Sequence, residues 1–185
     1  AWDAMHIMFS TAKGNVRRND LSDFKNIMKN GKIAIRLDEA DSLVAVRPCR
    51  EEDHVLLATS SGKAIRFAVN AVRVFKSRTS EGVRGMKLGE GDTVVSMSIS
   101  NGREANSEQR DAYLKWANAQ RRTEDTQEED SASGSSASDS STNESGETIA
   151  LDDATLNAFQ EAEQMLLTIT ENGFGKRSSS FEYRV

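Results

Sequence analysis

The chain has 185 residues, a formal net charge of −5 and a sequence pI near 5.2, which taken alone argues against nucleic acid as a partner. That length suits one ordinary domain, or one domain with a large insertion. The single cysteine excludes an intrachain disulfide and fits a reducing cytoplasm, and no run of 18 apolar residues predicts a membrane span. The chain opens without Met or a signal peptide and ends in a predicted strand, so we expect a fragment of a longer protein.

The charge is unevenly distributed along the chain. Residues 101–164 hold five Lys/Arg against fifteen Asp/Glu, a net of −10, whereas the remaining residues carry a net of +5. Such asymmetry indicates a basic interaction surface that carries an acidic segment.

A hairpin pattern occurs three times. Residues 6–18 align with residues 54–66, and a third copy covers residues 165–177. Each copy has a short apolar run, a polar turn with glycine and a basic return strand, which predicts a β-hairpin. The glycines that supply the positive φ of the turns are Gly14, Gly62 and Gly173. The arginines that share one slot on the return strands are Arg18, Arg66 and Arg177.

The second half of the unit repeats as well, because residues 31–46 align with residues 82–97. Each stretch has an alternating strand, an acidic turn and an apolar strand. We therefore predict an all-β, propeller-like fold with four antiparallel strands per blade. The repeats are expected at about residues 6–53 and 54–100 within 1–100, and a third begins in residues 165–185.

Residues 101–164 interrupt the repeats and predict an insertion with a helix at each end. The helix-face positions are Tyr113, Trp116, Ala117 and Gln120 in the first, and Leu151, Thr155, Ala158, Phe159 and Ala162 in the second. Between them, residues 123–148 are almost wholly small, polar or acidic, so we expect disorder there. The insertion falls where a hairpin turn would otherwise lie.

Two motifs resemble the blade signature of the C-terminal domain of the DNA gyrase A subunit. The first spans residues 82–95 and reads Gly-Val-Arg-Gly-Met-Lys-Leu-Gly-Glu-Gly-Asp-Thr-Val-Val; the second spans residues 171–177 and reads Glu-Asn-Gly-Phe-Gly-Lys-Arg. The resemblance covers residues 6–100 and 165–185. It implies a six-bladed β-pinwheel whose blades exchange strands with their neighbours. In such a domain, DNA wraps around the basic rim.

The resemblance also implies a non-catalytic part of an ATP-hydrolysing type II topoisomerase in the bacterial cytoplasm, associated with the nucleoid. The implied partners are double-stranded DNA, the rest of the gyrase A subunit, and the gyrase B subunit in an A2B2 assembly. ATP and Mg²⁺ are expected on other domains or subunits. The family's seven-residue wrapping box has only degenerate equivalents here, at residues 25–31 and 76–82, so we do not expect this chain to wrap DNA alone. The catalytic tyrosine region has no counterpart, since Tyr113 is in the insertion and Tyr183 on a predicted blade strand.

A rim that binds DNA of many sequences needs Lys and Arg that follow the phosphates. The candidates recur on the return strands of the hairpins and before the third strands. They are Lys13, Arg17, Arg18, Lys29, Lys32, Lys63, Arg66, Lys76, Arg78, Arg84, Lys87, Lys176 and Arg177. The alternatives are solvated faces, charges that protect strand edges and, for the repeated arginine, an ion pair with an acidic turn of a neighbouring blade.

No catalytic or metal-binding residue is predicted. His6 and His54 head equivalent strands without a ligand cluster, and Cys49 lacks the setting of a nucleophile. Two other functions stay open: the related, more degenerate domain of topoisomerase IV, and a propeller that binds proteins. The acidic insertion either competes with DNA for the basic edge or is an inert solubilising loop.

Overall fold

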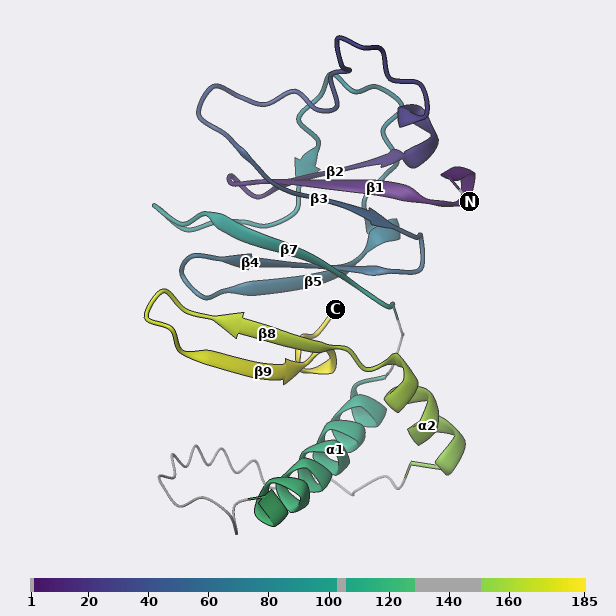
Figure 1. Cartoon of the computed structure of the whole chain (residues 1–185), viewed down its shortest axis with the longest axis vertical. Coiled ribbons are helices and arrows are strands. Elements are labelled where there is room, and N and C mark those ends of the chain that lie inside the picture. The colour runs from purple at the N-terminus through teal and green to yellow at the C-terminus, as the bar shows by residue number, and fades with distance from the viewer. Residues whose placement is uncertain (1, 103–105, 129–150) are drawn as a thin grey trace. The chain divides into compact units, whose positions relative to one another are not determined.

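The computed structural model describes residues 2–102, 106–128 and 151–185, with side chains up to residue 122 in the first helix. It contains antiparallel sheets and two α-helices (Figure 1). The chain divides into two compact units, the first made of residues 1–103 with 183–185 and the second of residues 104–182.

The first unit opens with a four-stranded sheet in the order β3-β1-β2-β6. Its strands are β1 (His6–Thr11), β2 (Asn15–Asp20), β3 (Leu43–Cys49) and β6 (Val83–Arg84). Gly14 has a φ of 83° in the turn between β1 and β2, a conformation that glycine adopts without steric cost. The first predicted hairpin is thereby confirmed, with Met8 opposite Arg18.

A second sheet repeats this arrangement in the order β5-β4-β7. Its strands are β4 (His54–Thr59), β5 (Ala64–Ala68) and β7 (Val94–Ser100). Leu56 lies opposite Arg66, and the pairing of β4 with β7 shifts register at Ala58/Thr59, as that of β1 with β3 does at Ser10/Thr11. The second hairpin is therefore confirmed as a structural copy of the first.

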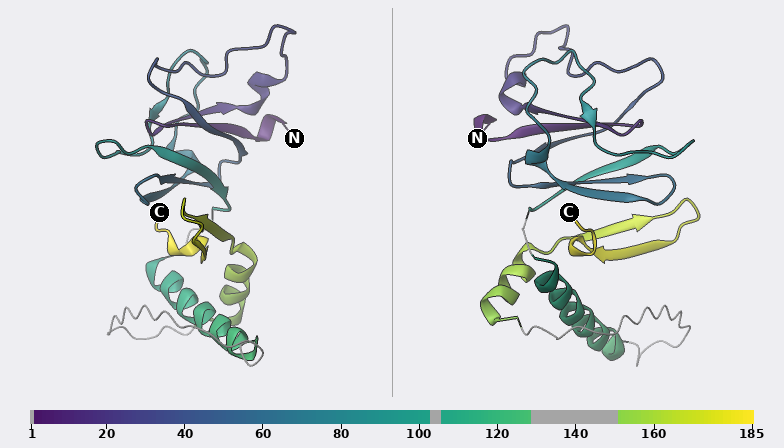
Figure 2. Two further views of the ribbon diagram at one scale, coloured as in Figure 1. Left: turned by 60° about the vertical axis from the view of Figure 1, so that its left-hand side comes forward. Right: turned by 180° about the vertical axis from the view of Figure 1, so that it is seen from behind.

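The third predicted strand joins the sheet of its own repeat in neither copy, and in the second copy it pairs with the neighbouring repeat, as the family resemblance implies. In the second repeat it is the two-residue β6, which leaves its own sheet and pairs with β2 of the first, with Val83 opposite Val16 and Arg84 opposite Asn15. Figure 2 shows the segment between β5 and β7 crossing to the first sheet. Among the described residues, only the first sheet has four strands, and its fourth strand, β6, comes from the second repeat.

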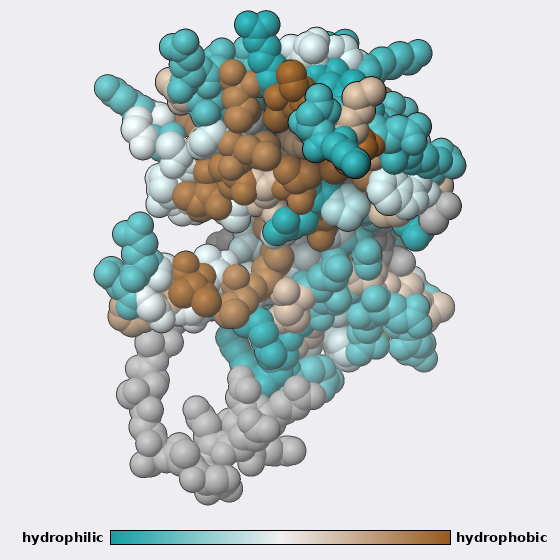
Figure 3. Space-filling view, turned by 45° about the horizontal axis from the view of Figure 1, so that its top comes forward, coloured by the Kyte–Doolittle hydropathy of each residue, from teal (hydrophilic) through white to brown (hydrophobic). Residues whose placement is uncertain are grey.

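The equivalent segment of the first repeat, residues 31–37, forms no strand, so that part of the prediction is wrong. A segment becomes a strand only when its backbone pairs with a neighbouring strand, and residues 31–37 pair with none of the described strands. Two of its large apolar side chains stay exposed, Ile33 to 70% and Leu37 to 37%, while Ile35 is half-buried. Apolar side chains gather on one face of this unit (Figure 3).

Both sheets contribute to one core in the first unit. Met8, Val16, Val55, Leu57 and Met97 are each at most 3% exposed and pack into a single cluster. Burying a side chain of this size stabilises the fold by about 1.5–3 kcal/mol. The two repeats therefore share their apolar interior.

The second unit joins two helices to a third hairpin. Its elements are α1 (Ser107–Glu128), α2 (Asp153–Ala162), β8 (Met165–Ile169) and β9 (Gly175–Ser179). The hairpin is the third one predicted, with Leu167 opposite Arg177. Residues 123–128 continue α1 where we expected disorder, because extending a helix is easier than starting one. Residues 129–150 lie outside the described part of the chain.

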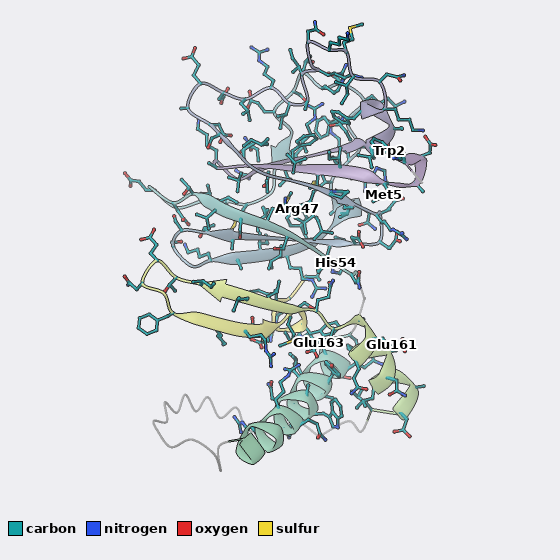
Figure 4. All side chains as sticks on the ribbon, viewed as in Figure 1. Trp2, Met5, Arg47, His54, Glu161 and Glu163 are labelled. Atoms are coloured by element: carbon teal, nitrogen blue, oxygen red, sulfur yellow. The ribbon has the colours of Figure 1, made fainter. Side chains whose placement is uncertain are left out.

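An aromatic cluster holds the helices to the turn after β9. Tyr113 of α1 stacks on Phe159 of α2 with ring centroids 5.0 Å apart, and Phe181 meets the Phe159 ring edge-on at 5.2 Å. The Tyr113 hydroxyl donates to Glu163 over 3.0 Å, and Arg121 Nη2 donates to the same carboxylate over 2.6 Å. Glu163 lies at the end of α2 (Figure 4).

Candidate nucleic-acid interface

The structure separates the candidate basic side chains into a buried and an exposed set. The buried ones are Arg17, Arg18 and Arg66. The others are exposed or, in the case of Arg78, half-buried. A phosphate contact needs an accessible charge, so the two sets require separate interpretations.

Arg17 is fully buried on β2 and holds a loop of the second repeat. Its Nε donates to Asn19 Oδ1 over 2.8 Å and its Nη1 to the Ser80 carbonyl over 2.5 Å. The guanidinium also lies 5.4 Å from the Phe75 ring centroid, a cation–π distance. Burial, and then the charge of Arg78, lowers the pKa of Arg17. We assign Arg17 to packing and remove it from the DNA surface.

The repeated arginine slot is also a packing position in the first unit. Arg18 is 5% exposed; its Nη1 donates to the Val69 carbonyl over 3.1 Å, and its Nη2 lies 3.6 Å from the carboxylate of Glu51. Glu51 belongs to the turn between β3 and β4, within the same predicted repeat as Arg18, so this contact differs from the predicted ion pair with a neighbouring blade.

Arg66 fills the same slot in the second sheet and is likewise 5% exposed. It donates to the carbonyls of Asn101 and Tyr183, each over 3.4 Å, and burial lowers its pKa. We remove Arg18 and Arg66 from the DNA surface too. Arg177, the third member, is exposed on β9 of the second unit and stays a candidate.

Three of the exposed candidates meet in one groove of the first unit. Lys13 comes from the turn between β1 and β2, Arg84 from β6, and Lys87 from the segment after β6. The groove has a volume of about 530 Å³, and its other lining residues are Ala12, Ala40, Met86, Leu88, Asp92 and Thr93. The lining therefore combines apolar side chains with three positive charges and the carboxylate of Asp92.

Two carboxylates accompany this groove. Asp92 accepts hydrogen bonds from the Ser60 and Ser61 hydroxyls over 2.9 and 2.6 Å. These hydrogen bonds, that from Ser61 first, hold the pKa of Asp92 far below its usual range. The Asp92 carboxylate is therefore engaged by the hydroxyls of the turn at residues 60–61. Asp38 lies 3.9 Å from Lys13 Nζ; both side chains are about half exposed, and such a pair is weak in water.

The remaining exposed candidates are spread over loops and hairpins. Lys32 Nζ donates to the carbonyls of Asp23 and Asn26 over 2.7 and 3.3 Å, and Arg78 Nη1 to the Ile33 carbonyl over 3.1 Å. These two therefore also brace the loop before β3. The exposed others are Lys29, Lys63 and Lys76 in the first unit, and Lys176 with Arg177 in the second.

The exposed Arg36 is among the arginines that the sequence reasoning left out. Arg36 occupies the slot of Lys87 when residues 31–37 are aligned with residues 82–88, and it is exposed. The repeat itself was the signal that could have found it. By contrast, no repeat pattern brings Lys13 next to Lys87, since their meeting depends on exchange between sheets.

The described residues contain no group of three or more His, Cys, Asp or Glu that could hold a metal ion. Cys49 is buried at the end of β3, and burial raises the pKa of its thiol to about 12. None of the helices in the described residues has the length and apolar character needed to cross a bilayer.

Comparison with known proteins identifies the family. The family described as "DNA gyrase C-terminal domain, beta-propeller" matches residues 6–50, 53–101 and 164–185. The DNA gyrase A subunit of Rickettsia bellii is 50% identical over 184 residues, and that of Rickettsia felis 50% identical over 186 residues. Each alignment covers 100% of this chain and 19% of the relative, so the chain spans about a fifth of those proteins.

A solved structure titled "Structure of DNA gyrase A C-terminal domain" is 31% identical, with a TM-score of 0.47, and covers 52% of this chain and 31% of that one. The family match leaves out residues 102–163, whereas the alignments with the Rickettsia proteins run through them. The match over the repeats confirms the resemblance seen in the sequence motifs. The chain belongs to the family of DNA gyrase C-terminal β-propeller domains.

Proposed function

We propose that this chain binds double-stranded DNA without sequence preference, as the C-terminal domain of a DNA gyrase A subunit. The observation that carries the proposal is the exposed groove in which Lys13, Arg84 and Lys87 converge on a domain of this family. In the whole enzyme such binding supports ATP-dependent negative supercoiling, with ATP and Mg²⁺ bound on other domains or subunits. The fragment itself is a non-catalytic part of that bacterial, cytoplasmic topoisomerase.

The chemistry of the groove suits phosphates better than bases. Lysine and arginine attract a polyanion and release its condensed counterions, which gives affinity that depends steeply on salt. Reading bases requires side chains inserted into a DNA groove, whereas these three residues come from a turn, a two-residue strand and a loop. DNA of any sequence offers the phosphates, so binding is expected to be general.

The rest of the gyrase A subunit is the proposed protein partner, together with the gyrase B subunit in the A2B2 assembly. Support comes from residues 31–37, which align with residues 82–88 but form no strand. Residues 82–88 reach an edge strand of the preceding repeat, so residues 31–37 are expected to reach a further repeat in the same way. Exposed Ile33 and Leu37 would be covered there. The acidic character of residues 101–164 has no assigned role in this proposal.

Titration of the chain with labelled duplexes of two unrelated sequences tests the proposed function. We expect binding of both duplexes at about 50 mM salt and a loss of affinity of an order of magnitude or more at about 200 mM. Unwrapped binding is expected, because the chain carries only degenerate equivalents of the wrapping box. No binding to either duplex at the lower salt concentration would contradict the proposal and favour a protein-binding propeller.

A further inference from the structure

The basic groove is built from two repeats. Lys13 belongs to the first hairpin, whereas Arg84 and Lys87 belong to the second repeat and arrive with its exchanged segment, residues 82–88. Neither repeat alone supplies the three charges. We infer that DNA binding and the docking of residues 82–88 on the first sheet are coupled, so that each strengthens the other. This inference rests on the proposed function.

The docking contacts end directly beside the basic side chains. The amides of Gly85 and Met86 both donate to the Gly14 carbonyl, over 2.8 and 3.1 Å. Gly14 follows Lys13 in the turn, and Lys87 follows Met86. The Gly14 carbonyl therefore joins the two halves of the groove one residue away from a lysine on each side, in addition to the pairing of β6 with β2.

The approach of the segment depends on a glycine. A Cβ at Gly85 would lie 2.7 Å from Val16 Cγ1 and 3.3 Å from Leu57 Cδ1, both in the core. A side chain at this position therefore pushes the segment outward. Gly89 lies shortly after the same segment with no atom within 4 Å of an added Cβ, so it provides a matched control.

The undocked state is represented within the same molecule. Residues 31–37 carry Arg36 in the slot of Lys87, but they form no strand and are mostly exposed. Strand pairing therefore does not fix Arg36 beside a hairpin of another repeat, as it fixes Lys87 beside the hairpin of β1 and β2. The basic side chains Lys13, Arg84 and Lys87 therefore form one binding site only when residues 82–88 are docked on the first sheet.

Electrostatics gives the coupling its sign. Docking brings Arg84 and Lys87 to Lys13, and these three positive charges outnumber the carboxylates of Asp38 and Asp92 at the groove, so the net repulsion opposes docking. A bound phosphate backbone removes that opposition by placing negative charge among them. By linkage, a ligand that favours the docked state must be bound more tightly by it.

Hydrogen exchange of the unmodified 185-residue chain tests the coupling directly. With duplex DNA at about 100 times its Kd, exchange of the Gly85 and Met86 amides is expected to slow by up to about 100-fold. The Val72 amide, which donates to the Val69 carbonyl in a 3-10 turn of the same unit, is the internal control. Equal slowing at all three positions, or no slowing at Gly85 and Met86, would overturn the inference.

Two glycine variants complete the test, compared with the charge variant R84Q/K87Q. At about 0.1 M salt, we expect both Gly85→Ala and R84Q/K87Q to lower DNA affinity by about tenfold for each phosphate that is no longer bound. The control Gly89→Ala is expected to leave the affinity unchanged. If R84Q/K87Q weakens binding and a folded Gly85→Ala does not, the coupling is wrong while the proposed function stands. If R84Q/K87Q has no effect, the groove is not the DNA site. Should Gly85→Ala fail to fold, hydrogen exchange of the wild-type chain decides.

Discussion

At the scale of single residues, basic side chains from repeated positions of the sequence have opposite environments. Arg18 is 5% exposed and bound to a carbonyl of the second repeat, whereas Lys87 is exposed in the groove. The sequence showed a repeated basic slot in both cases. It did not show which side chains point into the seam between repeats, because strand alternation assigns a face only once the neighbouring sheet is known.

Replacing Arg18 by Met tests the packing role. The variant removes the hydrogen bond from the charged Arg18 side chain to the Val69 carbonyl, which still accepts from the Val72 amide, and we expect it to lower the free energy of unfolding by about 1–3 kcal/mol. The salt dependence of DNA binding should stay that of the wild type. Denaturant unfolding and a duplex titration of the same sample measure both. A stable variant with a shallower salt dependence would show that Arg18 contacts phosphate.

At the scale of elements, the hairpins were predictable from residue patterns, whereas strand exchange was implied only by the family resemblance and its pairing residues were not predictable. Glycine-containing turns between apolar and basic runs predicted all three hairpins, since turn geometry is local. The pairing of β6 with β2 joins residues from different repeats, and its two-residue length leaves no periodicity to read. The helices were predictable because Tyr113, Ala117 and Phe159 keep helical spacing, but their packing on Phe181 was not.

The aromatic cluster makes the helices part of the structure around the third hairpin. Phe159 is 1% exposed between Tyr113 and Phe181, so Phe159→Ala should destabilise the second unit by about 3–5 kcal/mol. Trp116 fluorescence in a Trp2→Phe background reports on this unit. Phe174→Ala, at a phenylalanine that is 75% exposed in the same unit, is the control. Equal effects of the two substitutions would rule out the cluster as a core.

The Glu163 carboxylate predicts a pH dependence for the second unit. Burial by itself raises the pKa of Glu163, but hydrogen bonds, that from Arg121 first, outweigh it and leave the pKa below its ordinary value of 4.5. A lowered folded-state pKa contributes stability above about pH 4.5 that is lost as the pH falls through the folded value. Glu163→Gln should therefore unfold with less pH dependence between about pH 5 and pH 3. A wild-type slope in this variant would exclude Glu163 as the titrating group.

At the scale of the whole molecule, the net charge of −5 conceals two opposed parts. Residues 101–164 carry −10 and the repeats +5, so the average says little about the surface proposed to bind DNA. The helices at both ends of the insertion pack on Phe181 within the second unit. Residues 129–150 lie outside the described part of the chain. Family membership could be predicted from the blade motifs. The division of the basic residues between packing and surface required the structure.

Deleting residues 129–148 tests whether the acidic segment acts on DNA binding. The deletion keeps both helices and removes Glu129, Asp130, Asp139, Glu144 and Glu147. We expect unchanged DNA affinity, as for a solubilising segment. A higher affinity that disappears as salt is added would instead establish competition with DNA, because screening weakens such an effect.

The central claim is that phosphates bind in the groove formed by Lys13, Arg84 and Lys87. The most direct measurement is the slope of log K against log salt for the triple variant K13Q/R84Q/K87Q. Its matched control, K25Q/R50Q/K115Q, removes the same charge from positions outside the groove. The account predicts a slope shallower by about 0.9 for each phosphate that is no longer bound, about 2.7 for all three, and a wild-type slope for the control. Equal slopes for the two variants would contradict it.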